Sequence, residues 1–82
     1  MNYGILFERI VEPGFPSGHY YAHIPSLGLT THGAGIEGAR AAARELLAQW
    51  IAEKRANHEA VPAPGETFFS TLELGEDALQ SA

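Results

Sequence analysis

A long amphipathic helix is the feature that most constrains the fold of this chain. From Ile36 to about Asn57, apolar side chains recur at the 3.6-residue spacing of an α-helix and form one stripe. The stripe consists of Ile36, Ala39, Ala43, Leu46, Leu47, Trp50 and Ile51. Because polar residues occupy the opposite side, we expect the helix to lie on a surface that the rest of the chain supplies.

The residues before this helix predict three β-strands. Residues 3–12 and 29–32 are rich in β-branched and aromatic types, and residues 19–24 alternate strictly between two faces. On the first strand we expect one apolar face, made of Tyr3, Ile5, Phe7 and Val11. On the second strand the alternation separates Tyr20, Ala22 and Ile24 from His19, Tyr21 and His23. Residues 13–18 contain two prolines and two glycines and predict a hairpin loop.

The residues after the helix predict a linker, a last strand and a tail. Asn57, Pro62 and Pro64 are stop signals for the helix, so residues 58–65 are interpreted as a linker across the sheet edge. Residues 67–74 alternate again and predict a fourth strand with Phe68, Ser70, Leu72 and Leu74 on one face. Residues 75–82 are expected to form a loose acidic tail.

The resulting element order, β-β-β-α-β, predicts a two-layer α+β domain over residues 1–74. One helix would cover one face of a mostly antiparallel sheet. The chain has 82 residues, and a domain of this size buries only roughly 60% of the surface of its unfolded chain. We therefore expect self-association, as a homodimer or a higher homo-oligomer, to contribute to stability.

Composition excludes several classes of protein. Cysteine is absent, so disulfides and thiolate chemistry are not expected. The formal net charge of −5 disfavours direct nucleic-acid binding and favours a basic protein partner. The start of the chain is not basic, and no apolar run reaches the roughly 20 residues of a membrane span. We therefore expect a soluble, cytoplasmic protein without a membrane partner.

Several short motifs occur in an order and spacing that is similar to the HicB family of antitoxins. They are the aromatic strand Tyr20–Ile24 followed by Pro25-Ser26-Leu27-Gly28, then Thr31-His32-Gly33, then a helix with Glu37 and Ala39, and finally Val61-Pro62-Ala63-Pro64. The resemblance covers roughly residues 3–66. The chain departs from the family pattern at Ser26, where Asp is usual, before Gly28, where a Pro is missing, and at Ala34-Gly35, where Asp-Thr is usual.

The resemblance implies a partial ribonuclease H-like fold and an inhibitory function. A HicB-like domain would neutralise a small, basic, messenger-RNA-cleaving toxin of the HicA type by covering its catalytic surface. Family members commonly carry a C-terminal DNA-binding domain, and we expect none here because only about 17 residues follow Gly65. The alternative is an orphan HicB-like regulator or a small-ligand-binding homo-oligomer without a toxin partner.

No enzymatic activity and no cofactor are expected. A ribonuclease H-type nuclease needs several carboxylates that converge on divalent metal. The predicted strands offer only Glu8, Glu12 and Glu73, and the single Asp, Asp77, lies in the tail. A zinc site made of His19, His23 and His32 is an alternative, although histidines on the open face of a small sheet are more often surface or interface residues.

The candidate contact surface is the sheet face that the helix would not cover. Exposed aromatic side chains commonly anchor protein interfaces, and a homo-oligomer contact would use the same kind of surface. The candidate partner-binding residues are His19, Tyr21, His23, Ser26, Leu27, Thr31 and His32.

Overall fold

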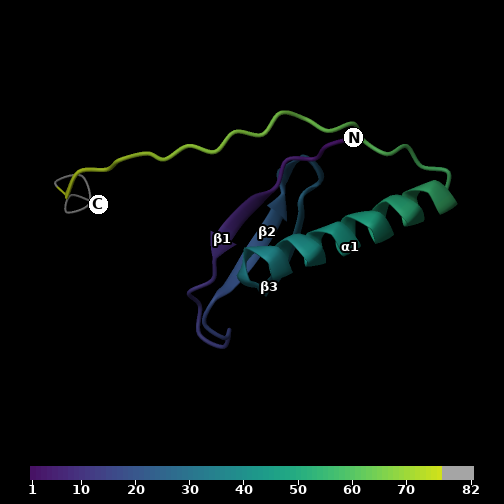
Figure 1. The fold of residues 1–82 in the computed structure, drawn as a ribbon. Coiled ribbons are helices and arrows are strands. Elements are labelled where there is room, and N and C mark those ends of the chain that lie inside the picture. Colours follow the sequence, from purple (N-terminus) through teal and green to yellow (C-terminus); the bar gives the residue numbers. More distant parts are fainter. Residues whose placement is uncertain (77–82) are drawn as a thin grey trace.

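A computed structural model of the chain describes residues 1–76 and contains one antiparallel sheet and one helix. The sheet has the order β1-β2-β3, with β1 (Leu6–Arg9), β2 (His19–Ile24) and β3 (Leu29–Ala34). The helix α1 (Gly35–Ala56) follows β3 directly and lies across one face of the sheet (Figure 1). The predicted α+β class is thus confirmed, with a two-layer arrangement of one helix on one sheet.

The core lies between α1 and the central strand. Ala22 and Ile24 of β2 and Ala39 and Ala43 of α1 are buried, as the two sequence periodicities predict. Half-buried apolar side chains surround this cluster: Tyr3, Ile5, Phe7, Tyr20, Leu27, Leu29 and Leu47. Small side chains at the centre allow the helix to approach the sheet closely. Ile36, at the start of the stripe, is 43% exposed.

Gly33 is the point of closest approach between the two layers. A Cβ atom at this position would lie 2.4 Å from the backbone carbonyl carbon of Gly38. Only glycine fits there, because the opposing atoms belong to the helix backbone and cannot move independently. β3 continues to Ala34, two residues beyond the predicted end of the third strand, because Gly33 and Ala34 still pair with Tyr20 and His19 of β2. The chain then turns at once into α1.

The helix ends in a Schellman motif that includes a non-glycine residue. His58 has a left-handed backbone, with φ of 56°. The amide of Glu59 donates to the carbonyl oxygen of Lys54 at 2.8 Å, and the amide of His58 donates to that of Arg55 at 3.1 Å. These bonds satisfy the last helical carbonyl groups, so the predicted stop near Asn57 is confirmed within one residue.

The first strand is shorter than predicted, and Val11 does not share its apolar face. The regular strand ends at Arg9, after which the chain enters the hairpin loop, and Val11 is 84% exposed. Ile10 is buried instead, and its amide donates to the carbonyl oxygen of His19 at 2.9 Å. The two-residue alternation therefore fails where the chain bends out of the sheet.

The predicted fourth strand over residues 67–74 is wrong. These residues have no regular secondary structure, and the chain leaves the helix and the sheet after passing the N-terminus (Figure 1). Phe68, Phe69, Leu72 and Leu74 are exposed. Alternation gives a strand its pattern but no pairing partner, and here the segment does not pair with any of the three strands. The expected tail, residues 75–82, lies outside the described residues from position 77 onward.

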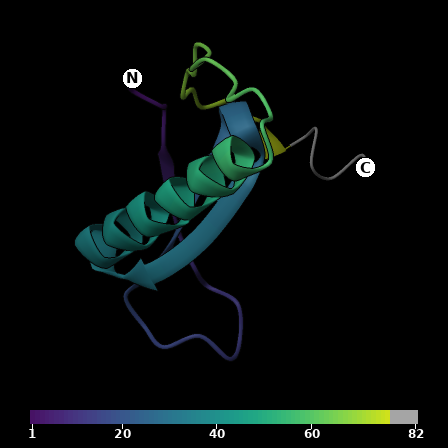
Figure 2. The same ribbon diagram turned by 90° about the vertical axis from the view of Figure 1, so that its right-hand side faces the viewer.

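The linker crosses the end of the sheet, and two hydrogen bonds hold it there. The Tyr3 hydroxyl donates to the carbonyl oxygen of Pro62, and the amide of Gly65 donates to Ser26 Oγ at 3.3 Å. Seen along the helix, this part of the chain folds back over the same end of the sheet as the N-terminus (Figure 2). Residues 58–65 therefore run from the end of α1 to the N-terminal segment and to the turn between β2 and β3.

Candidate protein-binding face

The face of the sheet opposite α1 carries a contiguous group of aromatic and polar side chains, which we call the open face. Its position follows from the strand register, because residues that pair across neighbouring strands point to the same side. Tyr21 lies between Glu8 and His32, and His23 lies between Leu6 and Thr30. Since α1 packs on the side of Ala22 and Ile24, these residues lie on the uncovered side.

His23 connects all three strands of the open face. Its Nε2 lies 3.0 Å from Glu8 Oε1 on β1, and its Nδ1 lies 3.0 Å from Thr30 Oγ1 on β3. The His23 side chain is 32% exposed and the Glu8 side chain 66%, so solvent reaches both groups. The imidazole is thus held in one orientation while one side of the ring remains accessible.

Tyr21 and Phe15 form the aromatic centre of the open face. The two rings meet edge-on with centroids 6.0 Å apart, and Phe15 also meets His32 edge-on at 5.2 Å. His19 completes the group, with its ring centroid 6.1 Å from that of His32. Edge-to-face contacts fix the rings relative to one another. The hairpin loop that carries Phe15 therefore folds onto the open face.

The Tyr21 hydroxyl lies in an acidic environment. It donates a hydrogen bond to Glu12 Oε1 at 3.2 Å. Desolvation, this hydrogen bond and the negative charges of Glu12 and Glu8 all raise the pKa of the Tyr21 phenol above its ordinary value. The phenol therefore holds its proton more tightly than an ordinary tyrosine, and it donates that proton in a hydrogen bond to Glu12.

The structure brings together four of the seven predicted contact residues: His19, Tyr21, His23 and His32. The other three lie elsewhere. Thr31 pairs with Ala22 and shares the helix-facing side of the sheet, and Leu27 packs against the core. Ser26 lies in the 3-10 turn between β2 and β3, where its hydroxyl accepts the Gly65 amide.

Sequence reasoning missed Glu12, Phe15 and Thr30 as parts of this face and assigned no partner to Glu8. The missing information was the register of the two hairpins, which places Glu8 beside Tyr21 and Thr30 beside His23. A signal did exist for Phe15, because it is the one aromatic residue in a loop otherwise made of Pro, Gly and Ser. Such a residue needs an apolar neighbour to pack against.

The histidines of the open face do not converge. His23 is engaged by Glu8 and Thr30, whereas His32 lies beside Phe15 and His19 lies beside His32. Within residues 1–76, no group of three or more His, Asp or Glu residues could hold a metal ion. The same part of the chain contains no helix that combines the length and apolar character of a membrane span.

Comparisons with known proteins add no assignment. No protein family, curated protein or solved structure matches the chain.

Proposed function

We propose that this chain is an antitoxin-type protein-binding module that neutralises a small, basic, messenger-RNA-cleaving toxin of the HicA type. The open face is the surface that binds the toxin and covers its catalytic residues. The three strands and α1 correspond, in this proposal, to part of a ribonuclease H-like domain. The observation that carries the proposal is the cluster of half-buried Tyr21 and Phe15 with exposed His32 beside the carboxylates Glu8 and Glu12.

The chemistry of the cluster suits a basic protein partner. Rigid aromatic side chains supply contact area at little entropic cost, and such residues dominate the binding energy of protein interfaces. Glu8 and Glu12 add negative charge around them, in a chain whose formal net charge is −5. This negative charge accelerates the encounter with a cationic partner and disfavours binding of anionic proteins.

The order of the motifs supports the choice of the HicA type among basic partners. Pro25-Ser26-Leu27 forms a 3-10 turn that ends at Gly28, which has a left-handed backbone with φ of 66°. This turn joins the aromatic strand β2 to β3, and Thr31-His32-Gly33 leads from there into α1. These segments are the ones whose sequence is similar to the HicB pattern.

A pull-down from native cell extract with the tagged chain, followed by mass spectrometry, tests the proposal. We expect a small basic protein that is released at high salt and is inactive as a ribonuclease while bound. Tyr21→Ala should weaken binding at least about thirtyfold, the loss typical of a central aromatic anchor. Gln49→Ala is the matched control, because Gln49 is exposed on the opposite layer, and it should bind normally.

The outcome that contradicts the proposal is recovery of the chain itself, or of a small molecule, without a toxin. In that case the module is an orphan regulator or a ligand-binding homo-oligomer. Toxin binding that survives Tyr21→Ala unchanged would keep the antitoxin function but remove the open face as its site.

A further inference from the structure

The outer edge of β1 and the groove beside it form a second surface, separate from the open face. In the described part of the chain β1 pairs only with β2, so its other edge offers backbone amide and carbonyl groups without strand partners. Helix α1 packs mainly on β2 and β3 and leaves a groove of about 320 Å³ between itself and residues 1–5, the segment that leads into β1. Its apolar lining includes Tyr3, Ile5, Ala43 and Leu47.

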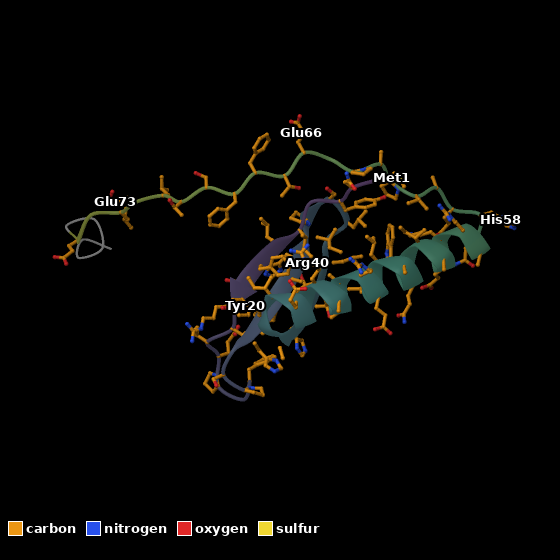
Figure 3. All side chains as sticks on the ribbon, viewed as in Figure 1. Met1, Tyr20, Arg40, His58, Glu66 and Glu73 are labelled. Carbon is orange, nitrogen blue, oxygen red and sulfur yellow. The ribbon has the colours of Figure 1, made fainter. Side chains whose placement is uncertain are left out.

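Two arginines make the rim of this groove positive. Arg40 and Arg44 line it, and Arg40 reaches from α1 toward β1, with its guanidinium carbon 5.2 Å from the centre of the Phe7 ring (Figure 3). Neither arginine forms an ion pair within residues 1–76. The groove is therefore apolar at its floor and cationic at its rim.

Residues 67–74 have the complementary properties. Phe68 is 81% exposed, Phe69 76% and Leu72 94%, in an extended segment that pairs with no strand. Residues 66–76 include three glutamates, Glu66, Glu73 and Glu76, and no lysine or arginine. An exposed apolar segment with strand periodicity and an unpaired sheet edge commonly associate by strand addition.

The path of the chain favours a second copy as the occupant. Thr67 touches the start of the chain, since a Cβ atom at Gly4 would lie 2.7 Å from Thr67 Oγ1. Beyond Thr67 the segment diverges from its own β1 and carries its apolar side chains into solvent (Figure 1). A segment held away from its own sheet can reach the identical edge of a neighbouring copy.

We propose that two copies of this chain exchange residues 67–74, each segment adding a strand to the free edge of β1 in the other copy. Phe68 and Leu72 fill the groove beside Ile5. Glu66 and Glu76, which flank the segment, share the face of Phe68 and Leu72 by the two-residue alternation and lie toward the arginine rim. The two contacts are identical, so the exchange closes into a symmetric dimer. The interface leaves the open face free, and it does not depend on the function proposed for that face.

Sedimentation and light scattering of the full chain at several concentrations test the exchange. We expect a dimer for the unmodified chain and a dissociation constant raised at least about tenfold in the double variant Phe68→Asp, Leu72→Asp. Val11→Asp is the matched control, because Val11 is 84% exposed in the hairpin loop, and it should remain dimeric. A monomeric unmodified chain, or a double variant that dimerises normally, overturns the proposal.

Cross-linking distinguishes exchange between copies from pairing within one chain. The chain has no cysteine, so Ile5→Cys and Phe68→Cys each introduce a single thiol. Mixing the two single variants with a short bis-maleimide should give a covalent heterodimer, and replacing Ile5→Cys by Val11→Cys should abolish it. A third variant carries both Ile5→Cys and Phe68→Cys in one chain. If this variant forms an intramolecular cross-link at high dilution and the mixed single variants do not cross-link, the segment pairs with its own β1 and the exchange is wrong.

Discussion

Glu8 and His23 are diagonal neighbours across the β1–β2 pair, with Glu8 Oε1 3.0 Å from His23 Nε2. The same imidazole reaches Thr30 on β3 through its other nitrogen, also at 3.0 Å. One side chain of the central strand thus links both edge strands on the side that α1 does not cover. The open face therefore has its own stabilising contacts in addition to the core on the other side.

Replacing His23 should lower stability by a modest amount. Both hydrogen bonds are partly exposed, and each such bond contributes on the order of 0.5–1.5 kcal/mol. We expect His23→Ala to lower the free energy of unfolding by about 1 kcal/mol, measured by urea denaturation at 222 nm. A double-mutant cycle with Glu8→Ala should give a coupling of about 0.5 kcal/mol, as is usual for solvent-accessible pairs. Zero coupling would mean that the pair contributes nothing measurable to stability.

Tyr21 should titrate above the ordinary pKa of a tyrosine. Desolvation and the hydrogen bond to Glu12 raise its pKa, so the folded state holds the phenol proton more tightly than the unfolded state does. The stabilisation from this group is then fully present below the ordinary tyrosine pKa, about 10, and is lost as the pH rises through the raised value.

Ultraviolet difference titration at alkaline pH measures this effect. Subtracting the curve of Tyr21→Phe from that of the unmodified chain isolates Tyr21 from Tyr3 and Tyr20. We expect Glu12→Gln to lower the pKa of Tyr21, because it removes the negative charge while keeping an oxygen that accepts the hydrogen bond. A pKa that does not change in Glu12→Gln would show that Glu12 does not contact the phenol.

Gly33 and Gly38 provide a matched pair for the contact between the sheet and the helix. A Cβ atom at Gly33 would collide with the backbone of Gly38 at 2.4 Å, so Gly33→Ala must push the two layers apart. We expect a loss of about 2–4 kcal/mol, comparable with severe overpacking. At Gly38 a Cβ atom would meet its nearest neighbour at 3.5 Å, which is ordinary contact.

Gly38→Ala should therefore stabilise the chain. Alanine is favoured over glycine inside a helix by about 1 kcal/mol, and no collision offsets this gain. Thermal unfolding of the two variants, compared with the unmodified chain, checks that Gly33→Ala lowers the stability and that Gly38→Ala raises it. A Gly33→Ala variant as stable as the unmodified chain would show that α1 does not approach β3 as closely as the structure indicates.

How much of the fold could be predicted depends on how local its causes are. The helix and β2 were predicted almost residue for residue, because the apolar stripe with Ala39 and Ala43 and the alternation from His19 to Ile24 are properties of short segments. The segment 67–74 has the same alternation and was predicted wrongly, because a strand also needs a partner and no local pattern supplies one. The prediction that Val11 shares the apolar face of the first strand was wrong for a similar reason, because the chain bends out of the sheet before this residue.

The candidate site shows the same limit. Alternation alone placed His19, Tyr21 and His23 on one face, which the structure confirms. It could not show that Glu8 reaches His23 or that Phe15 folds onto Tyr21, because both contacts depend on hairpin register and on the path of the loop. Thr31 was predicted to be a contact residue, and the register puts it on the helix side of the sheet.

His58 offers the last and simplest test of the local geometry. Its left-handed backbone, with φ of 56°, lets the amide groups of His58 and Glu59 satisfy the last carbonyl groups of α1. A side chain in this conformation costs roughly 1 kcal/mol, and glycine avoids that cost. We expect His58→Gly to raise the free energy of unfolding by about 1 kcal/mol and His58→Ala to leave it nearly unchanged, since alanine also carries a Cβ atom. If glycine instead destabilises the chain, the imidazole makes a stabilising contact in solution that outweighs the strained backbone, and a thermal melt of the three proteins decides between these outcomes.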